Sequence, residues 1–177
     1  MLQLALKRPT NFTNSQAPQV LDPQTAFIID SILKDVIQRG TGRKAKILDR
    51  EDLGGKTGTT NGPRDAWFSG YSPTLVATAW LGFDDNSIIG KNESGGSAAL
   101  PIWIEFMAEA LKDTKQKPKL QPSGLVRVKI DEETGKRIGA HQEGIFEYFK
   151  SDEVPELLKG TGELPLDQQN PIPEDLF

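Results

Sequence analysis

Residues 54–60 (GGKTGTT) combine a cation, hydroxyl groups and glycines within one short stretch. Lys56 supplies the positive charge, and Thr57, Thr59 and Thr60 supply the hydroxyls. The glycines remove side-chain bulk, so a ligand can approach the backbone closely. A cation and hydroxyl donors can hold a carboxylate, and a fixed backbone N–H can stabilise the oxyanion of a tetrahedral intermediate. These residue types are compatible with one wall of an acyl-transfer site.

The Gly-Lys-Thr triplet also occurs in phosphate-binding loops, but its surroundings exclude that interpretation. A Walker A motif needs a glycine five positions before Gly55, and Arg50 stands there. A phosphate loop also opens a helix, whereas Asn61, Gly62 and Pro63 form a turn that leads into a strand. We therefore predict neither a nucleotide site nor a cofactor.

The residues after the triplet predict an antiparallel meander of three strands. The first strand holds the triplet, the second covers 65–71, and the third covers 74–82, where β-branched and aromatic residues are frequent. One structural alternative remains for the triplet itself. Lys56 and its threonine neighbours could serve only to discourage pairing at an exposed sheet edge.

Several further stretches accompany the triplet, namely 39–42 (RGTG), 52–53 (DL), 64–73 (RDAWFSGYSP), 95–96 (GG) and 98–103 (AALPIW). Together they resemble the C-terminal part of the transpeptidase domain of class A penicillin-binding proteins, closest to the 1A type. Lys-Thr-Gly is a signature of that family and of class A β-lactamases. The resemblance is clearest over residues 18–111. It implies an α+β class and a partial penicillin-binding protein or serine β-lactamase-like fold, with helices packed on an antiparallel sheet and an irregular tail.

The resemblance implies a role in peptidoglycan cross-linking. A serine attacks the D-Ala-D-Ala end of a stem peptide, which β-lactams mimic, and passes the acyl group to an amine of a neighbouring stem. Carried over residue by residue, Lys56 assists proton transfer near that serine, and the hydroxyls of Thr57 and Thr59 hold the substrate carboxylate. The N–H of Thr59 forms half of the oxyanion hole, and Gly58 keeps the strand open to the acyl chain.

Two other motifs of the family are not found in working form. Ser31 and Lys34 have the Ser-x-x-Lys spacing, but they lie inside an expected helix, on a face that Asp35 and Gln38 mark as solvated. A catalytic serine whose N–H helps form the oxyanion hole belongs near a helix start. The other family motif, Ser-x-Asn, is absent, because no serine is followed by Asn two places later. We therefore expect the nucleophile to lie outside this chain, and the chain alone to be inactive.

Apolar residues at helical spacing predict helices over 23–39 and 98–112. Asp22 is an N-cap for the first, and Pro101 fits the first turn of the second. By family likeness, the second helix packs on the sheet and places Trp103 in the core.

Weaker patterns cover the rest of the chain. A charged link at 42–52 contains a short extended piece at 45–48, and a strand is predicted at 125–130, followed by a turn at 134–135 and then little apolar pattern. We divide the chain into a poorly matched segment (1–17), the C-terminal part of a transpeptidase domain (18–115), a strand-bearing extension (116–150) and an acidic, proline-rich tail expected to be disordered or extended (151–177).

Composition narrows the classes of partner. The net charge of −4 argues against a nucleic-acid partner. The chain has no Cys, and Asp84, Asp85 and Asn86 lack the ligand spacing of a calcium loop, so we assign no metal. His141 is expected at the surface. No targeting signal or membrane span is recognised, and the resemblance places the full-length protein at the periplasmic face of the inner membrane.

Three hypotheses follow. The chain is a C-terminal piece of a transpeptidase, which is considerably longer, and its partners are stem peptides, β-lactams and the missing N-terminal portion. Alternatively, it is a non-catalytic interaction module that retains part of the fold and uses its acidic tail to bind partners. As a third option, it is part of a serine β-lactamase, but the sequence of residues 67–73 and the long tail disfavour this hypothesis.

Overall fold

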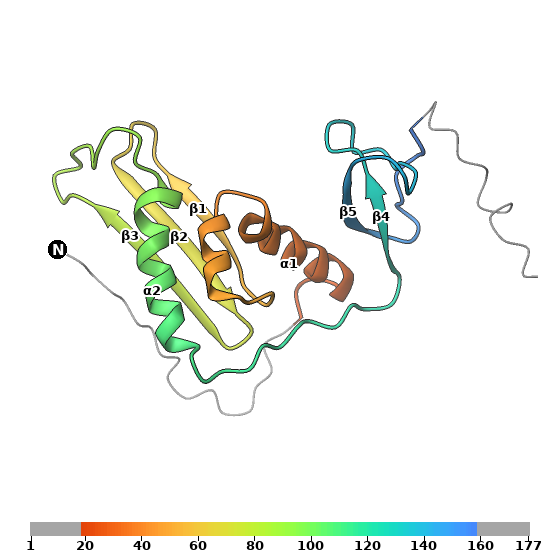
Figure 1. Ribbon diagram of the computed structural model, residues 1–177, viewed down its shortest axis with the longest axis horizontal. Coiled ribbons are helices and arrows are strands. Elements are labelled where there is room, and N and C mark those ends of the chain that lie inside the picture. The colour runs from red at the N-terminus through yellow and green to blue at the C-terminus, as the bar shows by residue number, and fades with distance from the viewer. Residues whose placement is uncertain (1–18, 159–177) are drawn as a thin grey trace, which may run out of the picture. The chain divides into compact units, whose positions relative to one another are not determined.

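The computed structural model describes residues 19–158, and these divide into two compact units at Pro122 and Ser123 (Figure 1). The expected N-terminal segment 1–17 and most of the expected tail, from residue 159 onward, lie outside the described residues.

The first unit is a three-stranded antiparallel sheet with helices packed against it (Figure 1). Its elements are, in order, α1 (Pro23–Gln38), the 3-10 helix η1 (Arg43–Leu48), β1 (Gly54–Thr59), β2 (Asp65–Ser72), β3 (Leu75–Gly82), the π-helical turn η2 (Gly95–Ala99) and α2 (Leu100–Ala110). The strands pair in the order β1-β2-β3, which confirms the predicted meander. The α+β class is confirmed as well.

Helix α1 begins as the sequence predicts. The carboxylate of Asp22 accepts a hydrogen bond of 2.9 Å from the N–H of Thr25, and Pro23 occupies the first helical turn. Phe27 and Ile37 are buried on one side of the helix. The cap and this apolar side therefore fix where the helix starts and which face it presents to the sheet.

The extended piece expected at 45–48 is wrong, because these residues belong to η1. The N–H of Ala45 donates to the carbonyl of Gly42 at 2.9 Å, and the turn ends at Asp49 in a left-handed conformation. In an extended strand, Ala45 and Ile47 would share one face. The helical turn instead buries Ala45 in the core and leaves Ile47 exposed.

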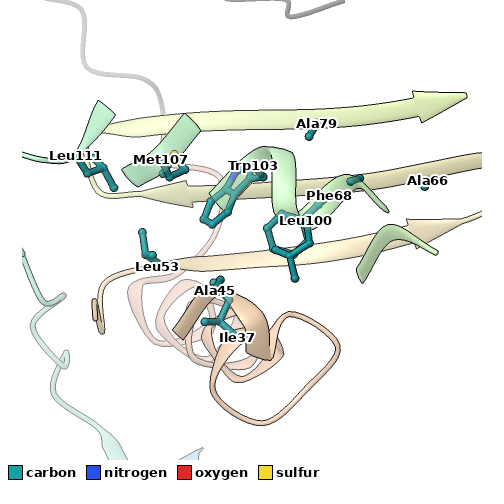
Figure 2. Close-up of a cluster of buried hydrophobic side chains, with 11 residues drawn as sticks. Ile37, Ala45, Leu53, Ala66, Phe68, Ala79, Leu100, Trp103, Met107 and Leu111 are labelled. Atoms are coloured by element: carbon teal, nitrogen blue, oxygen red, sulfur yellow. The ribbon is translucent and has the colours of Figure 1, made fainter. Parts of the chain in front are cut away.

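Helix α2 covers one face of the sheet and builds the core with it. Figure 2 shows Leu100, Trp103 and Met107 pointing from α2 toward the strands. The ring centres of Trp103 and Phe68 of β2 lie 4.9 Å apart in an edge-to-face arrangement. The indole N–H of Trp103 donates to the carbonyl of Ala77 at 3.1 Å. The core position predicted for Trp103 is confirmed, and η2 precedes the α-helix where the sequence predicted a single helix.

The second unit contains a two-stranded antiparallel sheet of β4 (Leu125–Ile130) and β5 (Ile145–Lys150). The sequence predicted β4 and missed β5, because IFEYFK places aromatic residues on both faces and shows no clear alternation. Leu125, Ile130 and Ile138 are its buried apolar residues. His141 is exposed, as predicted.

Candidate functional site

The side chains of β1 alternate between the two faces of the sheet. Thr57 pairs with Phe68 of β2, whose ring is fully buried, so Thr57 and Thr59 lie on the face that carries α2 and η2. Lys56 and Gly58 lie on the opposite face. The side chain of Lys56 therefore leaves the strand on one face of the sheet, and the threonine hydroxyls leave it on the other.

The backbone of β1 offers hydrogen-bonding groups along a free edge. In the described part of the chain, β1 is an outer strand of its sheet. The N–H of Thr60 donates to the carbonyl of Asp65 at 3.2 Å, so the antiparallel alternation turns the N–H and C=O groups of Thr57 and Thr59 away from β2. The ammonium of Lys56 donates to the carbonyl of Thr57 at 2.9 Å. This contact brings the cation from its own face to the edge.

Neighbouring segments fix both threonine hydroxyls. The oxygen of the Thr57 hydroxyl lies 2.8 Å from that of Thr41, and the Thr59 hydroxyl accepts the N–H of Gly95 at 3.0 Å. A threonine hydroxyl has one donor hydrogen and two acceptor lone pairs. Because Thr59 acts as acceptor toward Gly95, its own hydrogen remains for a ligand.

Turn η2 approaches β1 so closely that it requires glycine. A Cβ atom on Gly95 would overlap the carbonyl oxygen of Trp67 and lie 2.7 Å from that of Gly58. A Cβ atom on Gly96 would lie 2.9 Å from the carbonyl oxygen of Thr41. The missing side chains thus allow η2 to reach the strand and hold Thr59.

A buried ion pair holds the loop that enters β1. The guanidinium of Arg50 donates to both carboxylate oxygens of Asp52, at 2.9 and 2.8 Å, and to the carbonyl of Thr114 at 2.7 Å. The N–H of Lys117 donates to Asp52 at 3.0 Å. Burial acts to raise the pKa of Asp52, but these hydrogen bonds and the charge of Arg50 outweigh it and hold the pKa below its usual value. The pair therefore ties the segment after α2 to the start of β1.

Ser31 lies in the middle of α1. The ammonium of Lys34 pairs with Asp30 at 3.0 Å, and Asp30 also accepts the hydroxyl of Tyr71 at 2.7 Å. Burial, reinforced by Asp30, raises the pKa of Tyr71. The face that carries Ser31, Lys34, Asp35 and Gln38 is only partly exposed. The side chain of Lys34 is 22% exposed, whereas the apolar Ile32 is 55% exposed. The amine of Lys34 is engaged by a carboxylate, which supports our interpretation that Ser31 is not a nucleophile.

Residues 19–158 contain no cluster of three or more His, Asp or Glu side chains arranged to hold a metal ion. Asp84, Asp85 and Asn86 form an exposed turn, closed by a hydrogen bond of 3.0 Å from the N–H of Asn86 to the carbonyl of Phe83. Across the same stretch of chain, every helix is too short or too polar to cross a membrane.

Sequence reasoning found the strand but missed the groups that position it. Thr41 and Gly95 were part of the family resemblance, yet nothing in their spacing predicted contacts with Thr57 and Thr59. The Arg50–Asp52 pair was missed entirely, although a cation two residues before a carboxylate is a local signal.

Comparisons with known proteins place this geometry in a family. Penicillin-binding protein 1A of Pseudomonas aeruginosa is 45% identical over 183 residues, covering 99% of this chain. The chain belongs to the penicillin-binding protein 1A family. The Vibrio cholerae member is 40% identical over 165 residues, or 78% of the chain. No family model matches.

A solved structure of this family agrees with the fold. The crystal structure of penicillin-binding protein 1A from Haemophilus influenzae superposes with a TM-score of 0.70 and 36% identity over 78% of this chain. The chain spans 22% and 20% of the Pseudomonas and Vibrio proteins and 22% of the crystallised one. Its fold is accordingly part of a transpeptidase fold.

Proposed function

We propose that β1 is one wall of a D-Ala-D-Ala transpeptidase site whose serine nucleophile lies elsewhere in the full-length protein. The free edge of β1 carries this proposal. It combines an outward N–H at Thr59, two hydroxyls held by neighbours at Thr57 and Thr59, and the ammonium of Lys56. Family membership supplies the reaction class, acyl transfer in peptidoglycan synthesis.

The edge groups match the charges that develop in acyl transfer. As the serine oxygen bonds to the peptide carbonyl carbon, that carbonyl oxygen becomes an oxyanion, to which the N–H of Thr59 donates. One such donor lowers the barrier by roughly 3 kcal/mol. The C–N bond to the terminal D-Ala then breaks, and D-Ala leaves as a free amine that takes up the proton lost by the serine. An amine of a second stem next bonds to the acyl carbon and displaces the serine oxygen, which takes up a proton from that amine.

The side chains serve recognition and proton transfer. The hydroxyls of Thr57 and Thr59 donate to the terminal carboxylate of the stem peptide, which is the group that a β-lactam carboxylate imitates. Lys56 adds positive charge and assists proton transfer near the serine. Gly58, which has no side chain, leaves room for the acyl chain. The full-length protein would work at the periplasmic face of the inner membrane.

A chimera tests this role. This chain replaces the matching segment of the Pseudomonas penicillin-binding protein 1A, and a fluorescent penicillin reports acylation of the serine. We expect the chimera to be acylated, and Lys56→Ala to lower the acylation rate about 100-fold, the effect of one lost electrostatic contact. Lys44→Ala, which removes an exposed cation from η1, is the matched control.

The N–H of Thr59 can be tested separately from its hydroxyl. Thr59→Ala removes the hydroxyl alone, and Thr59→Pro also removes an N–H that makes no bond to β2. We expect Thr59→Pro to acylate about 100-fold more slowly than Thr59→Ala. Equal rates for the two variants would contradict the oxyanion role.

The alternatives give different results in the same assay. A folded chimera that never reacts would favour a non-catalytic module, and rapid release of hydrolysed penicillin would favour a β-lactamase. The chain alone should give no adduct by intact mass. An adduct mapped to Ser31 would overturn the assignment of the nucleophile to another segment.

A further inference from the structure

The β4–β5 sheet carries cations and aromatic rings together on one face. Arg127 pairs with Tyr148 and Lys129 pairs with Phe146, so these four side chains point to the same side of the sheet. We call them the cation–aromatic face. The opposite face carries Val126, Val128, Ile130, Ile145, Glu147 and Phe149.

Aromatic rings orient the guanidinium of Arg127. Its central carbon lies 5.0 Å from the ring centre of Phe146 and 5.7 Å from that of Tyr148. A guanidinium held against rings keeps its N–H donors at its rim, in the fork that matches a carboxylate. The ammonium of Lys129 lies 6.0 Å from the Phe146 ring and donates to the carbonyl of Ala140 at 3.2 Å. The face thus presents two oriented cations.

Part of the face is exposed, and its charge differs from that of the surrounding residues. Arg127 is exposed, and Phe146 is 51% exposed. Acidic residues outnumber basic ones over residues 123–158, yet none of the strand residues that share this face is acidic. Local structure has therefore gathered positive charge and aromatic surface at one place in an acidic unit.

We propose that the cation–aromatic face binds peptidoglycan strands, through their carboxylates and the apolar faces of their sugar rings. The identity of the polymer rests on the proposed function. Arg127 and Lys129 are two residues apart on one strand, about 7 Å, so they can pair with successive carboxylates of a repeating polymer. The exposed ring of Phe146 provides the flat apolar surface between them.

This chemistry favours an anionic glycopeptide over a lipid surface. Binding in a membrane interface needs a wide apolar face that inserts, and here one exposed phenylalanine is flanked by charges. A second contact with the polymer would also help the acyl-transfer wall of the same chain. Two sites on one chain can bind one polymer with a higher effective concentration than two separate molecules have in solution.

Sedimentation with purified, insoluble peptidoglycan tests the proposal on the full 177-residue chain. We expect the wild type to sediment, and Arg127→Gln combined with Lys129→Gln to weaken binding at least tenfold. The matched control combines Lys44→Gln and Lys136→Gln, two exposed cations outside the face, and should bind as the wild type does. Phe146→Leu keeps an apolar side chain but removes the ring, and should weaken binding severalfold.

The assignment is overturned if the wild type does not sediment, or if the Arg127/Lys129 double variant binds as well as the wild type. Preferential binding to phosphatidylglycerol vesicles would indicate a lipid ligand instead. Preferential binding to polyglutamate beads would indicate an acidic protein. Circular dichroism is used to check that each variant is folded. If the double variant does not fold, Phe146→Leu tests the same face independently.

The proposed transpeptidase role fails or holds separately. Penicillin acylation of the chimera depends on Lys56 and is expected to be unchanged by the Arg127 and Lys129 substitutions. A chimera that is never acylated, combined with face-dependent sedimentation, would refute the catalytic role and support the binding site. Acylation of the chimera, combined with failure of the chain to sediment, would support the catalytic role and refute the binding site.

Discussion

The two sheets of this chain obtain their order in different ways. The β1–β3 sheet is covered by α2, and its core contains Trp103 and Phe68, both almost completely buried. The β4–β5 sheet has only two strands, and its most buried residues are the aliphatic side chains of Leu125 and Ile130. One sheet is held by a core, and the other by pairing and surface contacts.

This difference determines where polar groups can be placed. A core of large side chains can stabilise a strand such as β1, which itself contributes glycines and threonines but little apolar surface. A two-stranded sheet is marginal alone, so contacts across its surface become a larger share of its stability. Substitutions should therefore have large effects in the first unit and small, local ones in the second.

Removal of Trp103 should have the largest effect. Trp103→Ala leaves a cavity between α2 and β2 and should lower the free energy of unfolding by about 3–5 kcal/mol, measured by urea denaturation. Trp67→Ala is the control, since that ring is 43% exposed and should cost only about 1–2 kcal/mol. Similar losses for both would show that α2 does not supply the main core.

Breaking the buried ion pair should come next. Asp52→Asn leaves Arg50 buried without its counter-charge and should cost about 3 kcal/mol at pH 7. The Arg50→Gln variant, which leaves the carboxylate unpaired, should be comparably unstable. A loss below about 1 kcal/mol would mean that the pair is not needed to hold the start of β1.

The same pair gives a pH dependence with a defined sign. The pKa of Asp52 is lower in the folded chain than its unfolded value near 4, so its stabilisation is present above about pH 4. It is lost as the pH falls through the lowered folded-state pKa. The wild type should therefore lose more stability than Asp52→Asn between pH 4 and pH 2, in urea titrations at each pH. Parallel losses would assign the acid sensitivity to other groups.

A smaller effect is expected where η2 meets β1. Gly95→Ala forces a methyl group against the backbone of Gly58 and Trp67 and should cost about 1–3 kcal/mol. In the chimera it should also slow acylation, because the backbone N–H at position 95 is displaced and no longer orients Thr59. Gly58→Ala is the control for stability, since its new Cβ would meet mainly the side chain of Trp67 at 3.2 Å. Equal destabilisation would mean that the close approach of η2 does not limit the site.

Local patterns predicted most of the first unit. The cap at Asp22 and the apolar spacing in both helices found α1 and α2, and the turn at Asn61–Pro63 with the aromatic residues after it predicted the meander. These features depend on neighbours in sequence, so the sequence alone reveals them.

The features that were missed depend on contacts between distant segments. Whether Ala45 belongs to a turn or a strand depends on the core that receives it, and the sequence around it allows both. The contact between Thr41 and Thr57 joins residues 16 positions apart. β5 becomes identifiable only from its register with β4. The sequence alone thus identified the strand of the candidate site, whereas the residues that support this strand became apparent only from the fold.

The smallest expected effect lies in the second unit. Arg127→Met keeps a long apolar side chain but removes the charge that rests on Phe146 and Tyr148. An exposed cation–π contact contributes about 0.5–1 kcal/mol, so global unfolding should change little. Amide exchange should instead accelerate severalfold within β4 and β5, with the amides of β1–β3 as an internal reference.

Lys136→Met is the control for this last substitution, because Lys136 is an exposed cation outside the two strands. If both variants accelerate exchange equally, loss of charge and not loss of ring contact is responsible. If neither does, pairing of the strands alone maintains the sheet. Selective acceleration by Arg127→Met would instead show that the residues proposed to bind the polymer also hold their own strands together, so occupation of the face by a ligand should slow the same amides.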